Sequence, residues 1–179
     1  MFEIMTCPLA GVVALRPTIR RDSRGSFVKT VHRAFFAEHG IPSEFAEQYY
    51  SYSIRNVLRG LHFQAPPNDH YKLVTCIEGD VLDVVMDLRR GSVTYGRHHV
   101  FELNDQRADS VFIPSGLAHG FYVRSASALV LYNVSTVHAP AYDTGIRWDS
   151  AGILWPTTAP HVSDRDAALP PFSVVDTPF

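Results

Sequence analysis

Cysteine is scarce in this chain, with only Cys7 and Cys76 among its 179 residues. Two cysteines form neither a disulfide framework nor a zinc-binding pattern, and free thiols in a reducing cytosol are the simplest interpretation. Strong net charge is missing too, because 16 basic residues nearly balance 18 acidic ones and leave a formal net charge of -2. This balance gives no electrostatic argument for nucleic acid or an anionic membrane as the main partner.

Long apolar runs are absent as well. No stretch approaches the roughly 18 uninterrupted apolar residues of a membrane span, and no basic segment followed by an apolar run marks the N-terminus. Yet 46% of the residues are hydrophobic and only 19% are charged, which is typical of a well-buried globular protein. We therefore expect a single domain over residues 1–179, located in the cytoplasm.

Short apolar segments separated by turn residues fill most of the chain. Twelve prolines and eleven glycines lie at short intervals, which indicates many short strands joined by turns. One short helix is expected over 33–39, closed by Gly40, and the segment beyond Pro140 is expected to be irregular, with Trp148 and Trp155 as anchors on the barrel wall. The expected strands are 11–15, 26–31, 45–53, 57–64, 72–77, 81–88, 98–103, 110–113, 120–123 and 128–134. This pattern predicts an all-β fold, a double-sheet jelly roll or barrel.

The stretch over 57–64 places charged and titratable side chains among apolar ones. If it is a regular strand, alternation puts Arg59 and Leu61 on one face and His62 on the other. An inward histidine, with Lys72 arriving on the next strand, can serve proton transfer next to an anion. Each residue alone fits an ordinary core or surface position equally well, but lysine and arginine are seldom buried without a partner.

A metal centre lacks its ligands in this sequence. The segment 114–120 places a turn directly before His119 and resembles the second motif of the cupin jelly rolls. Metal-binding cupins also need a paired His-x-His and a carboxylate in their first motif, where only His62 occurs here. His98 and His99 point to opposite faces of a strand and do not chelate together. Three such ligands are the usual minimum for a catalytic metal, so we expect no metal and no cofactor.

A series of motifs runs in order from about residue 11 to residue 170. They are Arg-Gly-Leu-His-Phe-Gln at 59–64, Lys-Leu-Val at 72–74, Asp-Leu-Arg at 87–89, Thr-Tyr-Gly at 94–96, Ile-Pro-x-Gly-x-Ala-His-Gly-Phe at 113–121, Leu-Tyr at 131–132, Gly-Ile-x-Trp at 145–148 and Ser-Asp-Arg-Asp at 163–166. In type and spacing they resemble the nucleotide-sugar epimerases typified by dTDP-4-dehydrorhamnose 3,5-epimerase. The resemblance implies a cupin-type jelly roll, a homodimer, no metal, and a nucleotide-linked 4-keto-6-deoxyhexose as substrate.

The resemblance also implies four catalytic roles. A 4-keto group acidifies the protons on C3 and C5, so a base can remove one to form an enolate and an acid can return one to the opposite face. His62 is similar to the family's base, and Asp166 to the carboxylate that orients it. Lys72 matches the cation that stabilises the enolate, and Tyr132 matches the donor that reaches the substrate from the other face.

Further positions are similar to substrate-binding residues of the family. Arginine suits bidentate phosphate contacts, and a histidine beside Lys72 suits the sugar. Several of these positions depart from the family. Glu47 and Tyr49 stand where the family has a Gln-x-Asn pair, and Lys29 stands where it has a glutamate. His138 replaces the tyrosine that stacks on thymine, and Asp143 replaces a glutamate. The substrate-binding positions implied are Arg24, Phe27, Lys29, Glu47, Tyr49, Arg59, His119, His138, Asp143 and Arg165.

The departures leave several functions open. The leading hypothesis is a cofactor-independent epimerase acting at C3, C5 or both. The alternatives within the same fold are a single-centre epimerase on a CDP- or GDP-linked sugar and a related ketoisomerase. A cupin that binds a sugar nucleotide without turning it over, and a metal-dependent oxygenase, fit less well, because the first needs no acid and base and the second lacks ligands.

Overall fold

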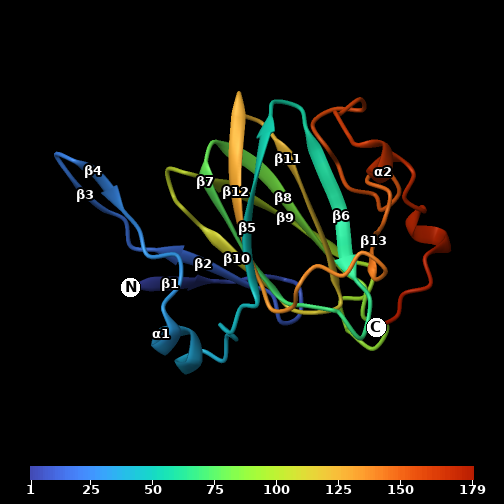
Figure 1. Cartoon of the computed structure of the whole chain (residues 1–179), viewed down its shortest axis with the longest axis horizontal. Helices are drawn as coiled ribbons and strands as arrows, with labels where there is room; N and C mark the ends of the chain where they lie inside the picture. The colour runs from blue at the N-terminus through green and yellow to red at the C-terminus, as the bar shows by residue number, and fades with distance from the viewer.

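Two antiparallel sheets carry the fold of the computed structural model, which describes residues 1–179 (Figure 1). Their strand orders are β1-β2-β10-β7-β12-β5 and β13-β6-β11-β8-β9. The first sheet contains β1 (Phe2–Met5), β2 (Val13–Pro17), β5 (Glu47–Ile54), β7 (Lys72–Glu78), β10 (Ser110–Ile113) and β12 (Ser127–Val134). The second contains β6 (Leu58–Gln64), β8 (Asp80–Asp87), β9 (His98–Asn104), β11 (Leu117–Val123) and β13 (Asp143–Gly145).

The main hydrophobic core lies between the two sheets. Its 18 buried residues include Val74 and Val130 from the first sheet and Val85 and Phe121 from the second. Residues that alternate along each strand point to one face, so both sheets bury an apolar face against the other. The expected double-sheet jelly roll is therefore confirmed.

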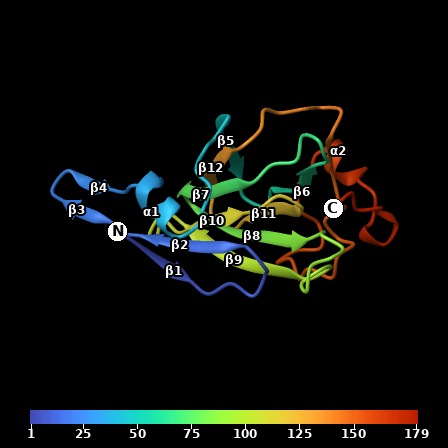
Figure 2. The same cartoon turned by 90° about the horizontal axis from the view of Figure 1, so that it is seen from below.

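The small elements gather at the two ends of the molecule (Figure 2). A two-stranded hairpin of β3 (Arg20–Asp22) and β4 (Gly25–Phe27) extends from one end, close to helix α1 (Arg33–Glu38). Helix α2 (Asp164–Ala167) and the C-terminal segment, with a 3-10 turn over Phe172–Val174, lie at the opposite end. None of the helices combines the length and the apolar character that a membrane span requires.

Most of the expected elements are present. Strands β1 and β3 and helix α2 were not expected, and two further segments differ from the expectation. The strand expected over 26–31 ends at Phe27, because residues 28–31 pair with no neighbouring strand and lead into α1. The chain beyond Pro140 is mostly irregular as expected, but β13 pairs with β6. The helix expected over 33–39 is confirmed and its cap at Gly40 is in the left-handed region, with φ of 66°.

The C-terminal segment covers the outer face of the second sheet. A second core cluster of eight buried residues, including Leu61 and Met86, packs under Trp155, Phe172 and Phe179. The Trp155 indole N–H donates to the Trp148 carbonyl at 2.9 Å, which ties the two tryptophans together. This layer buries one face of strand β6, and the other face lines a cavity between the two sheets.

Strand β6 contains one extra residue relative to its partner β11. Three residue steps separate Arg59 from His62, whereas only two separate their partners Phe121 and His119. This bulge reverses the alternation, so Arg59 and His62 both line the cavity while Leu61 is buried on the other side. The prediction that Arg59 and Leu61 share a face was wrong, because it assumed a regular strand.

Two glycines allow the strands to approach closely at this bulge. A Cβ built on Gly120 would lie 2.6 Å from the Arg59 carbonyl oxygen, and one on Gly60 would lie 2.5 Å from the Gly120 Cα. Gly60 also has φ of 125°, which side chains other than glycine rarely adopt. The Arg-Gly-Leu-His motif is therefore a backbone requirement as well as a chemical one.

Candidate active site

A cavity of about 730 Å³ opens between the two sheets, and ten of the fourteen candidate site residues line it. It is bordered by β5, β7 and β12 on one side and by β6 and β11 on the other. The ten are His62, Lys72, Tyr132, Glu47, Tyr49, Arg59, His119, His138, Asp143 and Arg165. Among the other four, Asp166 lies behind His62 and contacts it directly.

His62 and Asp166 form a tight pair. Nε2 of His62 lies 2.7 Å from Oδ1 of Asp166, and the Gly60 N–H donates to Oδ2 at 3.0 Å. Burial raises the pKa of the Asp166 carboxyl, but the hydrogen bonds from His62, Gly60 and Ser163 outweigh it and hold the pKa below its usual value. A carboxylate only accepts hydrogen bonds, so Nε2 of His62 carries the proton and Nδ1 is the basic nitrogen of the neutral ring.

Helix α2 places Asp166 in this position. Its N-cap Ser163 accepts a hydrogen bond from the Asp166 N–H at 3.1 Å, and the preceding segment is tied to β6 through the Leu58 N–H and the His161 carbonyl at 2.9 Å. The helix has only four residues. Its geometry therefore depends on the cap and on the β6 contact rather than on helix propensity.

Lys72 is buried at the start of β7, next to the His62 pair. Its Nζ donates to the His62 carbonyl at 3.4 Å, and no carboxylate pairs with it directly. Burial lowers the pKa of Lys72 to about 8, although the charges of Asp143 and Asp83 act in the opposite direction. A lysine with this pKa is mostly protonated at neutral pH but is poorly neutralised, which favours an anion bound beside it.

His119 forms a second pair with Asp83, at 2.7 Å between Nε2 and Oδ2. His119 is directly opposite His62 in the β6–β11 ladder. The other oxygen of Asp83, Oδ1, is buried without a partner. Asp83 sits in the middle of an apolar strand, and no sequence motif had singled it out.

Tyr132 approaches the cavity from the opposite sheet. It lies on β12, opposite Tyr49 on β5, and its ring stacks on that of Tyr49 with centroids 4.9 Å apart and an interplanar angle of 19°. The pKa of the Tyr132 hydroxyl is raised, mainly by burial, so the phenol stays protonated at neutral pH. A neutral phenol facing an Asp-paired imidazole across one cavity can act as an acid opposite a base.

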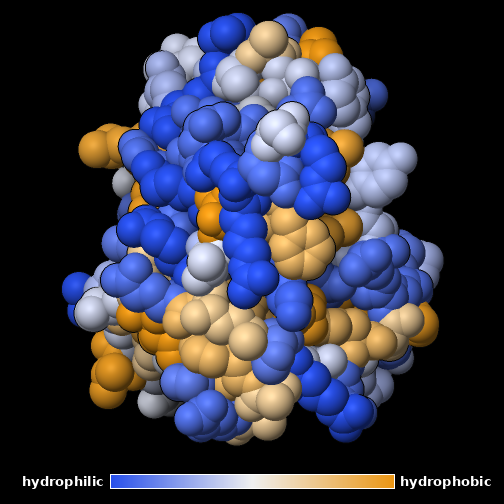
Figure 3. All heavy atoms as spheres, turned by 90° about the vertical axis from the view of Figure 1, so that its left-hand side faces the viewer, coloured by the Kyte–Doolittle hydropathy of each residue, from blue (hydrophilic) through white to orange (hydrophobic).

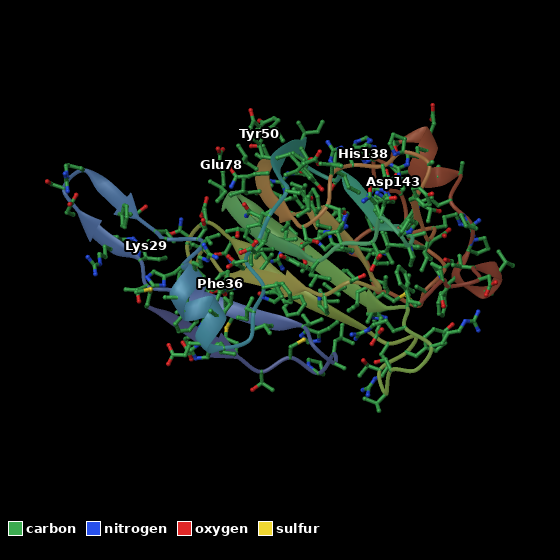
Figure 4. All side chains as sticks on the ribbon, turned by 60° about the horizontal axis from the view of Figure 1, so that its bottom comes forward. Lys29, Phe36, Tyr50, Glu78, His138 and Asp143 are labelled. Carbon is green, nitrogen blue, oxygen red and sulfur yellow. The ribbon has the colours of Figure 1, made fainter.

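At one end of the cavity His138 and Asp143 lie close together (Figure 4). Oδ2 of Asp143 forms an ion pair with Nη2 of Arg165 at 2.8 Å and lies 3.9 Å from Nδ1 of His138. The Glu47 carboxylate accepts a hydrogen bond from the His138 N–H at 3.2 Å. This end therefore offers a carboxylate acceptor, a cation and a flat ring.

The chain has close counterparts among known proteins. The sequence profile of the dTDP-4-dehydrorhamnose 3,5-epimerase family matches residues 6–173. The chain belongs to this family. It is therefore an isomerase of the epimerase type.

Individual relatives of this epimerase agree. The dTDP-4-dehydrorhamnose 3,5-epimerase of Methanothermobacter thermautotrophicus is 40% identical over 157 residues, covering 87% of this chain and 84% of that protein. A dTDP-4-dehydrorhamnose 3-epimerase of Streptomyces niveus is 39% identical over 161 residues, covering 88% and 78%. A Legionella pneumophila dTDP-6-deoxy-D-glucose-3,5-epimerase in complex with dTDP-4-keto-L-rhamnose superposes with a TM-score of 0.93 at 32% identity, covering 98% and 95%. The fold is thus the expected cupin-like jelly roll.

Three candidate residues of the epimerase lie outside its own cavity. Arg24 and Phe27 are on the exposed β3–β4 hairpin and Lys29 follows it, far from His138 and Asp143 (Figure 4). The Arg24 side chain is 88% exposed and pairs only with Asp22. Within one chain these residues contact no part of the cavity.

Arg59 is anchored at the wall of the epimerase cavity. Its Nε donates to the Ser53 hydroxyl at 2.9 Å and its Nη2 donates to the Tyr52 carbonyl at 3.3 Å. Both partners are neutral, so the positive charge of Arg59 has no carboxylate to balance it. It is therefore available to an anionic group of a bound molecule.

The epimerase site also contains Gln64 and His70, which were not among the candidate residues, although Gln64 ends the motif at 59–64. The Gln64 amide oxygen accepts the Ala139 N–H at 2.7 Å, so its NH₂ group faces the Asn68 carbonyl at 2.7 Å and His70 Nδ1 at 3.1 Å. Nδ1 of His70 is thus an acceptor and its Nε2 carries the proton. Burial, followed by the charge of Lys72, lowers the pKa of His70 to about 3. His70 therefore lines the cavity as a neutral ring, a role that only the tertiary contact with Gln64 reveals.

No group of three histidine, cysteine, aspartate or glutamate side chains comes together in a geometry that could hold a metal ion. His98 and His99 lie on β9 and not in the cavity. The two His–Asp pairs each use their carboxylate on their own imidazole. The side chains around the cavity are thus arranged as acids, bases and cations.

Proposed function

We propose that this epimerase inverts C3, C5 or both in a dTDP-linked 4-keto-6-deoxyhexose, without a cofactor, by removing and returning a proton. One observation carries the proposal: His62, with Asp166 bonded behind it, and Tyr132 come from opposite sheets and both line the same cavity. Inversion requires a base on one face of a carbon and an acid on the other. Neither a ketoisomerase nor a non-catalytic binding protein requires this two-sided arrangement.

Each cavity residue has a step in the proposed reaction. His62 takes the proton from the carbon next to the ketone, and Asp166 stabilises the imidazolium that forms. The pair of electrons left behind moves onto the ketone oxygen, where the buried Lys72 cation stabilises the enolate. Tyr132 then gives its proton to the opposite face of the same carbon. General acid–base catalysis contributes roughly 10²–10⁴-fold, so the enolate contact must supply much of the remaining rate.

The nucleotide end of the substrate is proposed from the other end of the cavity. Asp143 can accept the N3–H of thymine, whereas cytosine offers an acceptor at that position, so its carboxylate supports a dTDP-linked sugar. His138 provides a ring on which a base can stack, and Arg59 and Arg165 provide cations for a diphosphate. The family members named above act on dTDP sugars, which favours this base over CDP or GDP.

Solvent exchange tests the function directly. The protein is incubated with a dTDP-linked 4-keto-6-deoxyhexose in D₂O, and NMR follows deuterium at C3 and C5 together with product configuration. We expect incorporation with inversion at one or both carbons, which also counts the centres used. His62→Ala is the matched control and should abolish both exchange and inversion while the fold persists. No exchange at either carbon with the wild-type protein would refute the function.

The same assay tests the expectation that no metal takes part. Turnover should survive exhaustive chelation followed by dialysis, because the cavity groups supply acid, base and cation themselves. Loss of turnover on chelation, with recovery after adding one specific divalent ion, would contradict this expectation.

We further propose that the epimerase is a homodimer in which each hairpin completes the partner's cavity. The hairpin extends away from the body of the molecule. Its Phe27 is a large apolar residue that takes no part in the core of its own chain and is 58% exposed. Viewed from the side that carries the hairpin, apolar side chains lie open among hydrophilic ones (Figure 3). Strand β5 ends its sheet with a free edge, and its outward Tyr50 and Tyr52 are 66% and 56% exposed. An exposed edge and apolar surface of this kind support coverage by a second copy.

We also propose that the reaction takes place in the cytoplasm. Cys7 and Cys76 are both free thiols, Cys7 half-buried and Cys76 buried. Burial raises the pKa of both thiols, which favours the neutral thiol form, and free thiols are typical of a reducing compartment. Cell fractionation with activity measurement tests the location.

A further inference from the structure

Tyr49 contacts the proposed acid more closely than any other aromatic side chain of the cavity. Tyr49 and Tyr132 are direct partners in the β5–β12 ladder, and both side chains lie on the cavity face. Their rings are stacked, with centroids 4.9 Å apart and an interplanar angle of 19°. Side chains directly opposite one another in an antiparallel pair are close enough to restrict each other's rotamers.

A second aromatic contact fixes the edge of the Tyr132 ring. The His119 ring meets it edge-on, with centroids 6.0 Å apart and an angle of 74°, and His119 is itself bonded to the buried Asp83. One ring packs on the face of Tyr132 and another on its side. Of the two, only Tyr49 belongs to an edge strand, where no further strand supports it.

The position of the Tyr132 ring matters because its hydroxyl must reach a carbon from the face opposite His62. A tyrosine side chain can rotate about two bonds, and a displacement of about 1 Å can cost on the order of 10²-fold in rate. Aromatic stacking stabilises a ring pair beyond the area that it buries, which is enough to favour one rotamer over another.

We propose that Tyr49 is a positioning residue that holds the Tyr132 ring in its proton-donating orientation. This inference rests on the proposed function and extends it, because Tyr49 would act on the acid rather than on the substrate. The aromatic ring of Tyr49 positions Tyr132, and the Tyr49 hydroxyl is not needed for this. Burial, with the charges of Glu47 and Asp143, raises the pKa of the Tyr49 hydroxyl to about 12, so the group stays protonated and does not compete as a base.

The exchange assay separates this role from a substrate contact. His62 forms the enolate from the other side of the cavity, so proton removal does not depend on where Tyr132 lies. Losing the Tyr49 ring should therefore lower inversion more than deuterium exchange. A lost substrate contact would instead weaken binding and reduce both rates together.

Two variants test the ring against the hydroxyl. Tyr49→Leu removes the stacked ring and should lower the ratio of inversion to exchange by roughly three- to tenfold, the range expected for losing one aromatic stack. Tyr49→Phe keeps the ring and should keep the wild-type ratio within about twofold, since only the hydroxyl is lost. Both rates are measured at saturating substrate, and calorimetry with dTDP gives the affinity of each variant, so that loss of a substrate contact of Tyr49 is separated from displacement of the Tyr132 ring.

Ring dynamics provide a readout without turnover. NMR of protein labelled on the tyrosine rings should show slow flipping of Tyr132 in the wild type and in Tyr49→Phe, and faster flipping in Tyr49→Leu. Equal ratios in all three proteins, a Tyr49→Phe ratio as low as that of Tyr49→Leu, or unchanged ring flipping would each overturn the inference. A wild-type protein without exchange would refute the proposed function instead, while the flipping rates still decide whether Tyr49 holds the ring.

Discussion

At the scale of single residues, the two histidine–carboxylate pairs differ in their access to the cavity. The His62 side chain is 27% exposed, whereas that of His119 is 4% exposed. A base that removes a proton from a bound sugar must reach the cavity, so His62 suits that role. His119 is enclosed with Asp83 and packs against Tyr132, which suits a fixed support. The difference in burial thus favours different roles for His62–Asp166 and His119–Asp83, although both pairs have the same hydrogen-bond distance of 2.7 Å.

Replacing Tyr132 by phenylalanine should separate acid from base. The Tyr132→Phe ring retains the stack on Tyr49 and loses only the hydroxyl, so the cavity should stay intact. His62 can still remove a proton and return one to the same face, giving deuterium incorporation with retained configuration. Epimerised product should fall by roughly 10²-fold or more, a typical contribution of a general acid, and exchange should fall far less. Equal loss of both in a variant that binds substrate normally would mean that Tyr132 acts in forming the enolate.

The lowered pKa of Lys72 predicts a loss of activity at alkaline pH. Lys72 must be protonated to stabilise the enolate, and its pKa of about 8 means that the charge is present below that pH and is lost above it. The measurement is kcat/KM of the wild type against pH, which should fall as the pH rises through about 8. Lys72→Arg keeps its charge throughout, so its alkaline limb should shift to higher pH even if the rate is lower. An unchanged limb in that variant would assign the titration to another group.

At the scale of secondary structure, the site depends on two short irregularities. The extra residue in β6 turns Arg59 toward the same cavity as His62, and the four-residue helix α2 carries Asp166 to the imidazole. Neither element contributes much to the core. Both are held by backbone hydrogen bonds to neighbouring segments, so they are points where a small change should affect catalysis more than folding.

The cap of α2 tests this separation. Ser163→Ala removes the hydroxyl that accepts the Asp166 N–H, which should cost about 1 kcal/mol of stability. The effect on kcat should be larger than that of an equally destabilising core substitution such as Ile113→Val, because the carboxylate that orients His62 loses its fixed position. Ser163→Thr retains the cap and should behave like the wild type. Thermal unfolding and kcat are measured for Ser163→Ala, Ser163→Thr and Ile113→Val. If kcat falls only in proportion to the loss of stability, the cap has no separate role in catalysis.

The regular parts of these elements were predictable, and the irregular parts were not. Period-two apolar patterns located most strands, and the motif residues His62, Lys72 and Tyr132 meet in one cavity as expected. The alternation rule failed at Arg59, because a bulge depends on the residue count of the partner strand, which one strand's pattern does not contain. Asp83 was missed for a similar reason, since its role comes from a histidine 36 residues away.

At the scale of the whole molecule, the single chain leaves its hairpin without a partner. Arg24, Phe27 and Lys29 match substrate-binding positions of the family but lie away from the cavity of their own chain. A symmetric pair of chains could bring each hairpin to the other's cavity, and each cavity would then combine residues from both copies. The distance of these three residues from the cavity of their own chain is thus an argument about how two chains assemble, and not about the chemistry of the site.

Mixed dimers would reveal such sharing. Arg24→Ala should impair both cavities of its own dimer, and His62→Ala should inactivate them. After mixing and re-equilibration, half of the dimers are heterodimers with one intact cavity each, so activity should return to about a quarter of the wild-type level. Mixing without any gain over the separate variants, although both are dimers by light scattering, would mean that each cavity is built from one chain.

Burial of the Tyr132 hydroxyl has a consequence for the time between turnovers. Under the proposed roles, each inversion leaves the protein with a phenolate on one wall and an extra proton on the other. The raised pKa of Tyr132 makes that phenolate unfavourable, so its recharging from water or from the opposite wall is strongly downhill. The form with Tyr132 protonated is therefore the favoured free form of the enzyme after product leaves. Product should therefore act as a plain competitor of substrate, and the reverse reaction should begin from the same protonation state of the protein.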